Sequence, residues 1–316
     1  MARPRSSTGG AGIALALVSS AAFGTSGTFA TSLIDAGWTP GAAVLARVLV
    51  AGLILTVPAC LQLRRVWPLL RADRLAALRR SALLVALYGT VAVAGAQLFF
   101  FNALQRIPVG VALLLEYLGI VLVVLWMWLR HAQRPRRLTV AGSAVALLGL
   151  LLVLGPSGSQ RPDPLGVLWG LGAGVGLAVY FVLSARAEEP LPPVALTWAA
   201  MLIGAATLAL LGAASALPLR AEFGRVRFAG RQTSWIFPVL GLSVIAAVGA
   251  YVSGIVAARL LGARLASFVG LTEVLFAVLF AWLFLGQLPS GMQLVGGAFI
   301  LAGVTLVRVD ELQAEG

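Results

Sequence analysis

Charged residues are scarce in this 316-residue chain, and cysteine and histidine occur once each. Only 11% of the residues are charged, against about 25% in a typical soluble domain, so the composition excludes an ordinary soluble globular protein. A single cysteine, Cys60, excludes a disulfide framework and a cysteine pair for metal or redox chemistry. The one histidine, His131, lies in a basic stretch without a second ligand nearby. HExxH, CxxC and Walker motifs are also absent from the sequence, and we therefore predict no metal, no cofactor and no enzymatic activity.

Long apolar runs dominate the sequence, which has 60% hydrophobic residues and a mean hydropathy of +0.99. A stretch of about 20 apolar residues is long enough to cross the hydrocarbon core of a bilayer as a helix. The runs predict an all-α integral membrane protein with ten transmembrane helices. The first run is too long for the 7–15-residue core of a signal peptide, so we expect it to be retained. We expect the helices at residues 11–34, 40–63, 81–105, 107–129, 138–155, 164–185, 193–217, 234–258, 262–286 and 290–308.

The basic residues give the chain a net charge of +12, and they gather in short segments between the apolar runs. This distribution is typical of the cytoplasmic loops of membrane proteins, so we predict no nucleic-acid partner. Most arginines fall on the cytoplasmic side if both termini are cytoplasmic. The positive-inside rule therefore predicts a multi-pass protein of the inner membrane, with the tails 1–10 and 309–316 in the cytoplasm. The arginine-rich segment 218–233 would then lie outside, against this rule.

An internal repeat divides the chain into two halves of five helices each, 11–155 and 164–308. The segment LLLEYLGIVLVVLWMWL around Glu116 matches GLTEVLFAVLFAWLFL around Glu273, and the next helix in each half carries two glycines. In the same way, AVAGAQLFFFNAL in the first half matches AAVGAYVSGIVAA in the second. Because each half holds an odd number of helices, the second half should enter the membrane in the opposite orientation. Inverted repeats are typical of alternating-access transporters, whose substrate site lies near the membrane midplane between the halves.

Three ionisable residues lie well inside the predicted helices: Arg47, Glu116 and Glu273. A charged side chain at this depth costs roughly 2.5–3.5 kcal/mol or more, so such residues usually have a function. The two glutamates are counterparts in the repeat, and we expect them to approach the membrane centre from opposite sides. A buried carboxyl group binds a substrate ammonium group when it is ionised and a proton when it is neutral. We predict that both glutamates bind substrate or couple transport to protons; the alternative is a structural pairing with Arg47 or Arg259.

Other polar side chains at membrane depth are candidates for the lining of a cavity. Each of them alone is more often a hydrogen-bonding partner between helices than a ligand contact. For Arg47, extension to a lipid headgroup and binding to a carboxylate are equally compatible with the sequence. The candidate lining residues are Tyr117, Thr272, Gln97, Tyr251, Asn102, Tyr88, Tyr180 and Arg47.

Together these features resemble the EamA branch of the drug/metabolite transporter superfamily, over about residues 11–308. The stretch IPVGVALLLEYLG is similar to the segment of threonine/homoserine-type exporters in which a glutamate and an aromatic residue follow small residues. TEVLFAVLFAWLFLGQLP is similar to the segment of the second repeat, which usually reads Glu-Pro and ends Leu-Gly-Glu. Here Val274 and Gln287 replace the proline and the second glutamate, and Phe23-Gly24 stands where Trp-Gly is common. Since a proline kinks a helix, Val274 should straighten this helix locally.

The resemblance implies an inner-membrane secondary transporter that exports small metabolites, with amino acids or related amines first among them. We expect alternating access with proton antiport. The expected partners are a small molecule, protons and the lipid bilayer, and a homodimer is one compatible assembly. An uncoupled facilitator, or a carrier of nucleotide-sugars or of lipid-linked or drug-like compounds, would use the same cavity. A membrane enzyme or assembly factor is disfavoured, because catalysis would gather polar groups at one membrane face.

Overall fold

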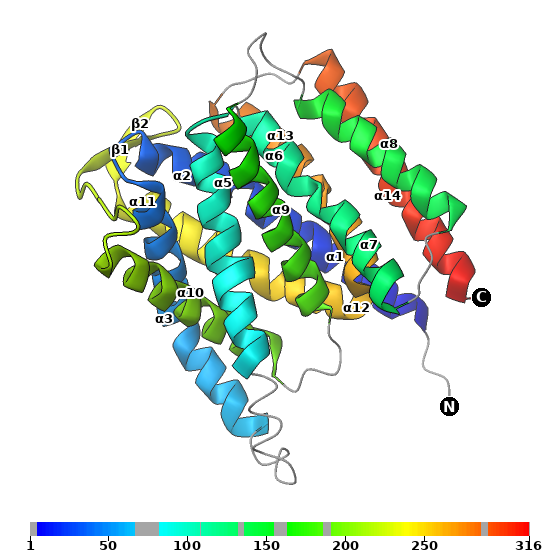
Figure 1. The fold of residues 1–316 in the computed structure, drawn as a ribbon, viewed down its shortest axis with the longest axis horizontal. Helices are drawn as coiled ribbons and strands as arrows, with labels where there is room; N and C mark the ends of the chain where they lie inside the picture. The colour runs from blue at the N-terminus through cyan, green and yellow to red at the C-terminus, as the bar shows by residue number, and fades with distance from the viewer. Residues whose placement is uncertain are drawn as a thin grey trace.

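The structure, a computed structural model, is built almost entirely of helices (Figure 1). It describes residues 5–66, 82–107, 109–131, 136–154, 163–185, 191–285 and 290–315. Two segments, η2 and η3, are π-helical, and one short hairpin supplies the strands of the described chain. In chain order the elements are α1 (Arg5–Gly24), α2 (Ser26–Ile34), α3 (Pro40–Val66), η2 (Tyr88–Gly95), α5 (Ala96–Leu104), α6 (Val109–Tyr117), α7 (Gly119–His131), α8 (Arg137–Leu154), α9 (Pro164–Ser184), α10 (Pro193–Ala213), β1 (Arg225–Phe228), β2 (Arg231–Ser234), α11 (Ile236–Leu240), η3 (Gly241–Gly249), α12 (Ala250–Gly270), α13 (Thr272–Leu285) and α14 (Gly291–Glu315).

Six helical stretches of the described chain are long and apolar enough to cross a membrane. They are Gly10–Ile34, Pro40–Arg65, Ala82–Ala103, Pro164–Ser184, Pro193–Ala213 and Ile236–Gly270. Shorter apolar helices occupy Arg137–Leu152, Thr272–Phe284 and Leu294–Val307. The chain is therefore a helical, multi-pass membrane protein. The count of ten transmembrane helices stays a prediction, because several of the predicted helices are interrupted.

Two of the predicted helices are each divided in two. The helix expected at 11–34 breaks at Thr25, whose hydroxyl donates to the Ala22 carbonyl at 2.6 Å and so competes with the helical backbone bonds. The helix expected at 107–129 breaks at Leu118, between α6 and α7. The hydrophobic pattern does not show these breaks, because the apolar run continues through them.

The helices expected at 234–258 and 262–286 correspond to the stretch from Ile236 to Leu285. Non-helical Gly262 separates two helical parts of α12 close to the boundary expected between them. Gly262 within α12 has a φ of 78°, a left-handed conformation that glycine adopts without strain and that bends the chain there. The chain breaks again after Gly270, where α12 ends.

The expectation that Val274 straightens its helix stays a prediction, because the helix is interrupted at Leu271, three residues before Val274. The Leu271 N–H donates to the Phe268 carbonyl at 3.1 Å, and the Val274 N–H donates to the Leu271 carbonyl at 3.2 Å. Both bonds span one residue fewer than an α-helical bond, so the chain tightens locally. The Thr272 hydroxyl also donates to the Val269 carbonyl, at 2.7 Å. The helical ladder is therefore interrupted at Leu271 without a proline, and these backbone and hydroxyl hydrogen bonds satisfy the groups at the interruption.

Residues 225–234, expected as part of a connection, form an antiparallel hairpin of β1 and β2. Val226 is buried, and Phe228 stacks on Phe29 of α2 with 5.1 Å between the ring centroids. The arginines that alternate with these two residues lie on the opposite face of the hairpin, because side chains alternate along a strand. An alternation over four residues is too short to stand out from a loop in the sequence.

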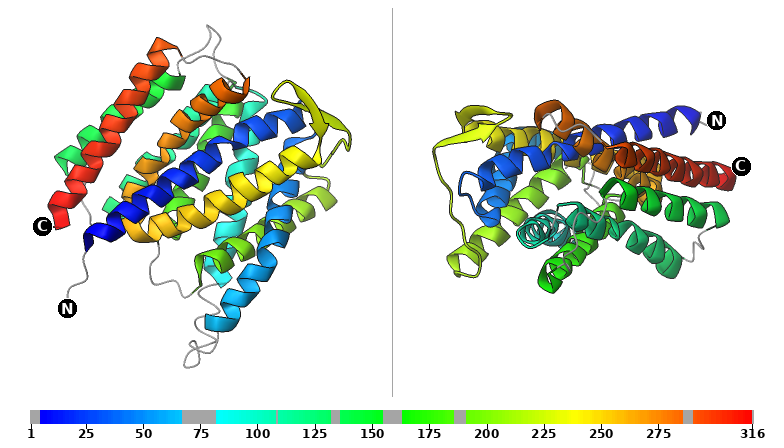
Figure 2. Two further views of the ribbon diagram at one scale, coloured as in Figure 1. Left: turned by 180° about the vertical axis from the view of Figure 1, so that it is seen from behind. Right: turned by 90° about the horizontal axis from the view of Figure 1, so that it is seen from above.

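The hairpin and the chain termini lie at opposite ends of the molecule. The start of α1 and the end of α14 are close to each other at one end, and the hairpin closes the other end (Figure 2). The predicted topology requires this separation. That the terminal end faces the cytoplasm stays a prediction.

The exposed side chain of Asp163 caps the start of α9 and forms an ion pair with the first repeat. Asp163 accepts hydrogen bonds from the backbone N–H groups of Leu165 (2.7 Å) and Gly166 (3.0 Å), which caps the helix. Its carboxylate also pairs with Arg106, just after α5, at 3.3 Å. The backbone N–H of Gly166 in particular holds the pKa of Asp163 below its ordinary value. Because both charged side chains are well exposed, the ion pair itself contributes little to stability.

The last helices of the two repeats, α8 and α14, pack side by side at one edge of the bundle (Figure 1). The two glycines that each helix carries in the repeat meet at their contact, the first of one helix with the second of the other. A Cβ at Gly142 would lie 2.8 Å from the Gly303 carbonyl oxygen, and one at Gly149 would lie 2.6 Å from the Gly296 carbonyl oxygen. Early positions of one helix meet late positions of the other, so the helices run antiparallel. An inverted repeat places equivalent helices in this relation.

Replacing Gly303 by alanine is expected to destabilise the protein by about 1–3 kcal/mol or more, because the added Cβ overlaps backbone atoms. That Cβ would lie 2.6 Å from the Ala146 amide nitrogen and from the Gly142 carbonyl oxygen. Thermal unfolding of the detergent-solubilised protein measures the effect. Gly291→Ala is the matched control, since nothing lies within 4 Å of a Cβ at this position of the same helix. Equal melting temperatures for the two variants would contradict the close crossing.

Candidate functional site

A small cavity lies between the two repeats. Its volume is about 60 Å³, and since a water molecule needs about 10–15 Å³ of such space, it holds a few waters or the head of one small molecule. Helices α1, α5 and α6 with η2 line it from the first repeat, and α9, α12 and α13 line it from the second. The lining residues are Ala16, Ser19, Ser20, Phe23, Ala92, Ala96, Gln97, Glu116, Tyr117, Leu177, Tyr180, Phe181, Tyr251, Gly254, Ala257, Ala266, Gly270 and Glu273.

Most of the candidate residues from the sequence come together here. Those in the lining are Glu116, Glu273, Tyr117, Gln97, Tyr251 and Tyr180. Tyr88 lies deeper in the core, where its hydroxyl is 2.7 Å from that of Ser184. Asn102 and Thr272 donate to backbone carbonyl groups three or four residues earlier in the chain. Arg47 lies behind the cavity wall. Binding of substrate by the lining residues stays a prediction.

Glu116 and Glu273 reach the cavity from helix ends beside chain breaks. Glu116 lies one residue before the end of α6, and Glu273 lies in the first turn of α13, where the helix dipole stabilises negative charge. The two carboxyl groups are close enough for their charges to interact, and the Tyr117 side chain lies near the Glu273 carboxyl group. Arg259, one of the two candidate partners, donates to the Leu191 carbonyl at 2.9 Å. In the described chain no cluster of three potential metal ligands forms around the pair.

Arg47 is only 1% exposed. One terminal nitrogen donates to the Gln97 side-chain oxygen at 2.8 Å and to the Ser26 hydroxyl at 3.0 Å, and the other donates to the Ala246 carbonyl. Extension to a lipid headgroup is therefore wrong, because the side chain is buried and held by these bonds. Among the described residues Arg47 forms no direct ion pair with either glutamate, although its charge acts on both.

A chain of hydrogen bonds connects the two repeats at the cavity wall. Gln97 and Tyr251 are counterparts in the repeat, and they contact each other: since Arg47 donates to the Gln97 oxygen, the Gln97 amide NH2 group faces the Tyr251 hydroxyl. The Tyr251 hydroxyl donates to the Ala92 carbonyl at 3.3 Å. Ala92 and Ala246, which accept from Tyr251 and Arg47, are also counterparts and lie in η2 and η3. Both π-helical segments thus supply a carbonyl acceptor that positions a side chain at the site.

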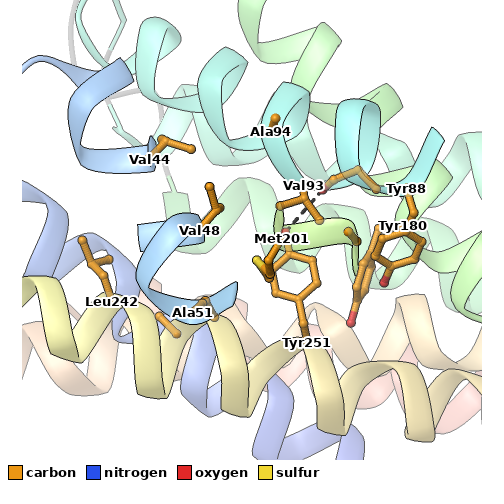
Figure 3. Packing of buried hydrophobic residues seen from close by; sticks show 14 of the residues in the cluster. Val44, Val48, Ala51, Tyr88, Val93, Ala94, Tyr180, Met201, Leu242 and Tyr251 are labelled. Atoms are coloured by element: carbon orange, nitrogen blue, oxygen red, sulfur yellow. Dashed lines mark hydrogen bonds between the residues drawn. The ribbon is translucent and has the colours of Figure 1, made fainter. Parts of the chain in front are cut away.

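Three aromatic rings, of Phe23, Tyr180 and Tyr251, form one corner of the cavity. Their centroids are 5.1 to 6.2 Å apart, and their planes meet at 68° to 89°. Figure 3 shows the two tyrosines beside Tyr88 at the edge of the apolar core. By strict geometry the Tyr180 hydroxyl makes no hydrogen bond within the described chain, but it lies beside the Ser19 hydroxyl, which donates to the Ala250 carbonyl at 2.8 Å and can itself accept from Tyr180. A polar ligand group would therefore compete with Ser19 for this hydroxyl.

The sequence did not indicate the contribution of α1, which supplies Ser19, Ser20 and Phe23 to the lining. These residues are small or apolar and do not differ from their neighbours in the run. The internal repeat could have indicated this contribution. Because α1 and α9 are counterparts, a candidate lining residue in α9, Tyr180, implies that α1 also faces the cavity.

Gly254→Ala is expected to displace the Tyr180 side chain. A Cβ at Gly254 would lie 1.9 Å from the Tyr180 hydroxyl oxygen and 2.8 Å from the Ser19 hydroxyl oxygen. If Tyr180 bonds to a charged ligand group, the displacement should lower ligand affinity by about tenfold, as measured by the KM for transport. The matched control is Gly27→Ala, where nothing lies within 4 Å of a Cβ. An unchanged KM in Gly254→Ala would remove Tyr180 from the binding site.

A small cavity with two acidic side chains, lined by helices of both repeats of a membrane protein, is the arrangement found in membrane transporters. Residues 10–155 and 164–309 each match the EamA-like transporter family. The chain therefore belongs to the EamA-like transporter family, which confirms the resemblance seen in the sequence.

Two curated relatives are named only as uncharacterized transporters. One, from Archaeoglobus fulgidus, is 30% identical over 207 residues, which cover 66% of this chain and 70% of that protein. The other, from Synechocystis, is 23% identical over 216 residues, which cover 67% of this chain and 62% of that protein. A solved crystal structure shares the fold, with a TM-score of 0.76 and 20% identity over 97% of this chain and 99% of that chain.

Proposed function

We propose that this protein exports small amines or amino acids across the cell membrane by proton antiport, with alternating access between its two repeats. One observation carries the proposal: the counterpart glutamates of the repeats, Glu116 and Glu273, face the same small cavity. Two carboxylates in a low-dielectric site are costly unless a partner balances their charge. A proton and a substrate ammonium group are both such partners, and each can replace the other.

Charge balance explains why the two occupants compete. With both carboxylates ionised, the pair and Arg47 together leave one unbalanced negative charge. One proton or one ammonium group neutralises that charge, whereas both together would leave a positive charge. A low-dielectric site favours the neutral states. The site therefore binds a proton or a cationic substrate in turn, and inward proton movement drives substrate outward.

Helix interruptions around the glutamates provide places at which the repeats can move. The α6 helix ends directly after Glu116 and Tyr117, and α13 begins directly before Glu273. The π-helical segment η2 lines the same cavity through Ala92, and η3 ends two residues before Tyr251, which also lines it. In transporters with repeated halves, broken helices line the site, and movement of one half against the other opens it to each side in turn. We expect the hairpin end and the terminal end of this protein to open alternately.

Everted membrane vesicles with an imposed pH gradient test the proposal. Single amines and amino acids are added in turn while a fluorescent dye reports the pH difference. A compound that dissipates the gradient in wild-type vesicles, and does not do so in Glu116→Gln vesicles, supports antiport. The variant vesicles also correct for neutral amines that diffuse through the bilayer. Identical responses of both vesicles to every compound would contradict antiport, and substrate uptake without a gradient would favour the uncoupled facilitator.

A further inference from the structure

The charges around the cavity narrow the substrate class within the proposed function. We propose that the substrate is a monovalent organic cation without a carboxylate group, exchanged one for one with a proton. Amines are then substrates, and zwitterionic amino acids are not. This inference rests on the proposed antiport function and adds to it the choice between the two substrate classes.

The described lining of the cavity offers hydroxyl groups but no positively charged partner to a ligand carboxylate. Glu116 and Glu273 carry the only formal charges among the described lining residues, which include no arginine and no histidine. The chain contains no lysine, so no lysine can pair with a ligand carboxylate. A ligand carboxylate would lie beside two acidic side chains, where like charges repel strongly in a low-dielectric surrounding. An amino acid would therefore gain binding at its ammonium group and lose it again at its carboxylate.

Arg47, the cation whose charge acts on both glutamates, is not placed to bind a ligand. Its terminal nitrogens are engaged by Gln97, Ser26 and the Ala246 carbonyl, and it is 1% exposed. Gln97 separates it from the cavity. Because the Gln97 oxygen accepts from Arg47, the group that Gln97 turns towards Tyr251 is its amide NH2. The charge of Arg47 thus offsets one of the two carboxylates, although the side chain itself does not contact a ligand.

The aromatic corner suits a cation. The rings of Phe23, Tyr180 and Tyr251 meet nearly at right angles, so they border the same part of the cavity from different directions. The face of an aromatic ring attracts a cation, and quaternary ammonium groups are bound well in this way. The Tyr180 hydroxyl, which lies beside that of Ser19, adds one hydrogen-bonding group for a polar substituent of the ligand.

Charge balance also fixes the valence of the ligand. Arg47 offsets one of the two carboxylates, which leaves one negative charge for the ligand. A diamine with two ammonium groups would leave an unbalanced positive charge, which a buried site disfavours. A cavity of about 60 Å³ likewise fits a small head group rather than an extended polyamine. Exchange of one monovalent cation for one proton moves no net charge across the membrane.

Uptake of labelled compounds into proteoliposomes with an outward proton gradient separates cations from zwitterions. Two matched pairs are compared: choline with glycine betaine, and valinamide with valine. Within each pair the size is similar, and the second compound carries a carboxylate. Choline has no neutral form and does not cross the bilayer as a free base. We expect initial uptake of the cation to be at least about tenfold faster in each pair, because like charges placed together are strongly penalised.

Each outcome of this experiment separates the inference from the proposed function. Equal or faster uptake of betaine and valine would overturn the inference and leave proton antiport intact. Uptake of none of the four compounds above the Glu116→Gln background would overturn both. Choline uptake that is unchanged when a membrane potential is imposed supports one-for-one exchange. Choline uptake that accelerates with an inside-negative potential would contradict it.

Discussion

Substituting Glu116 with glutamine is expected to abolish proton-coupled exchange while the protein remains folded. Glutamine has the same size and does not ionise. The remaining carboxylate of Glu273 is then balanced by Arg47, so the site has neither a proton to release nor a free charge for a cation. Loss of a hydrogen bond to a charged group, worth roughly 1.5–3 kcal/mol, alone predicts about a tenfold or larger fall in substrate affinity. Gradient-driven uptake and proton flux in proteoliposomes measure both effects.

Two further variants make the Glu116→Gln result interpretable. Glu222→Gln removes an exposed carboxylate close to the hairpin and should leave transport unchanged. Glu273→Gln should behave like Glu116→Gln, because the two carboxylates are equivalent in the charge balance. Full gradient-driven exchange in either cavity variant would rule out the exchange mechanism. A fall in melting temperature together with lost transport would instead indicate a structural role for the glutamate concerned.

Replacing Arg47 with leucine is expected to cause a large loss of stability. The side chain is 1% exposed and connects α3 to Gln97, Ser26 and the Ala246 carbonyl. Its removal leaves buried acceptors without a donor and both glutamates without a counter-charge. Removing one partner from a buried charged network typically costs about 3–5 kcal/mol. The variant should therefore unfold at a clearly lower temperature in detergent or fail to accumulate in the membrane.

The matched control for Arg47→Leu is Arg225→Leu, at an exposed position of the hairpin, which should melt like the wild type. Arg47→Lys keeps the charge and loses the planar guanidinium group with its several N–H donors. Its stability should therefore lie between those of the wild type and Arg47→Leu. Lower pH should partly restore Arg47→Leu, because protonation of the glutamates removes the two negative charges that the variant leaves unbalanced. Equal melting temperatures for Arg47→Leu and Arg225→Leu would show that the buried hydrogen bonds of Arg47 do not stabilise the fold.

The repeat in the sequence was sufficient to predict that two glutamates share one site. Counterpart residues of an inverted repeat approach the interface between the halves from opposite sides. For that reason the repeat predicted that Glu116 and Glu273 approach the membrane centre from opposite sides, whereas the proximity of Gln97 to Tyr251 was not predicted. The apolar runs likewise predicted the helical membrane class, since length and hydropathy alone decide that point.

The partners of Arg47 could not be predicted from the sequence. Its acceptors include the Ala246 carbonyl, and every residue has a carbonyl group, so the letters of the sequence do not identify which one accepts. The same holds for the breaks at Thr25 and Leu118, where the apolar run continues unchanged and local hydrogen bonds and packing decide the geometry. The hairpin was missed because its strands are only four residues long.

The most direct test is to measure whether ligand binding releases protons, because a proton and a cationic ligand that share one site must displace each other. Purified protein in detergent, in lightly buffered solution near neutral pH, is mixed with choline, and the change in pH is recorded. Competition for the Glu116 and Glu273 pair predicts release of up to about one proton per protein molecule, and no release with glycine betaine or from the Glu116→Gln variant. If choline raises the melting temperature of the protein without releasing protons, the exchange of proton and cation at this site is contradicted.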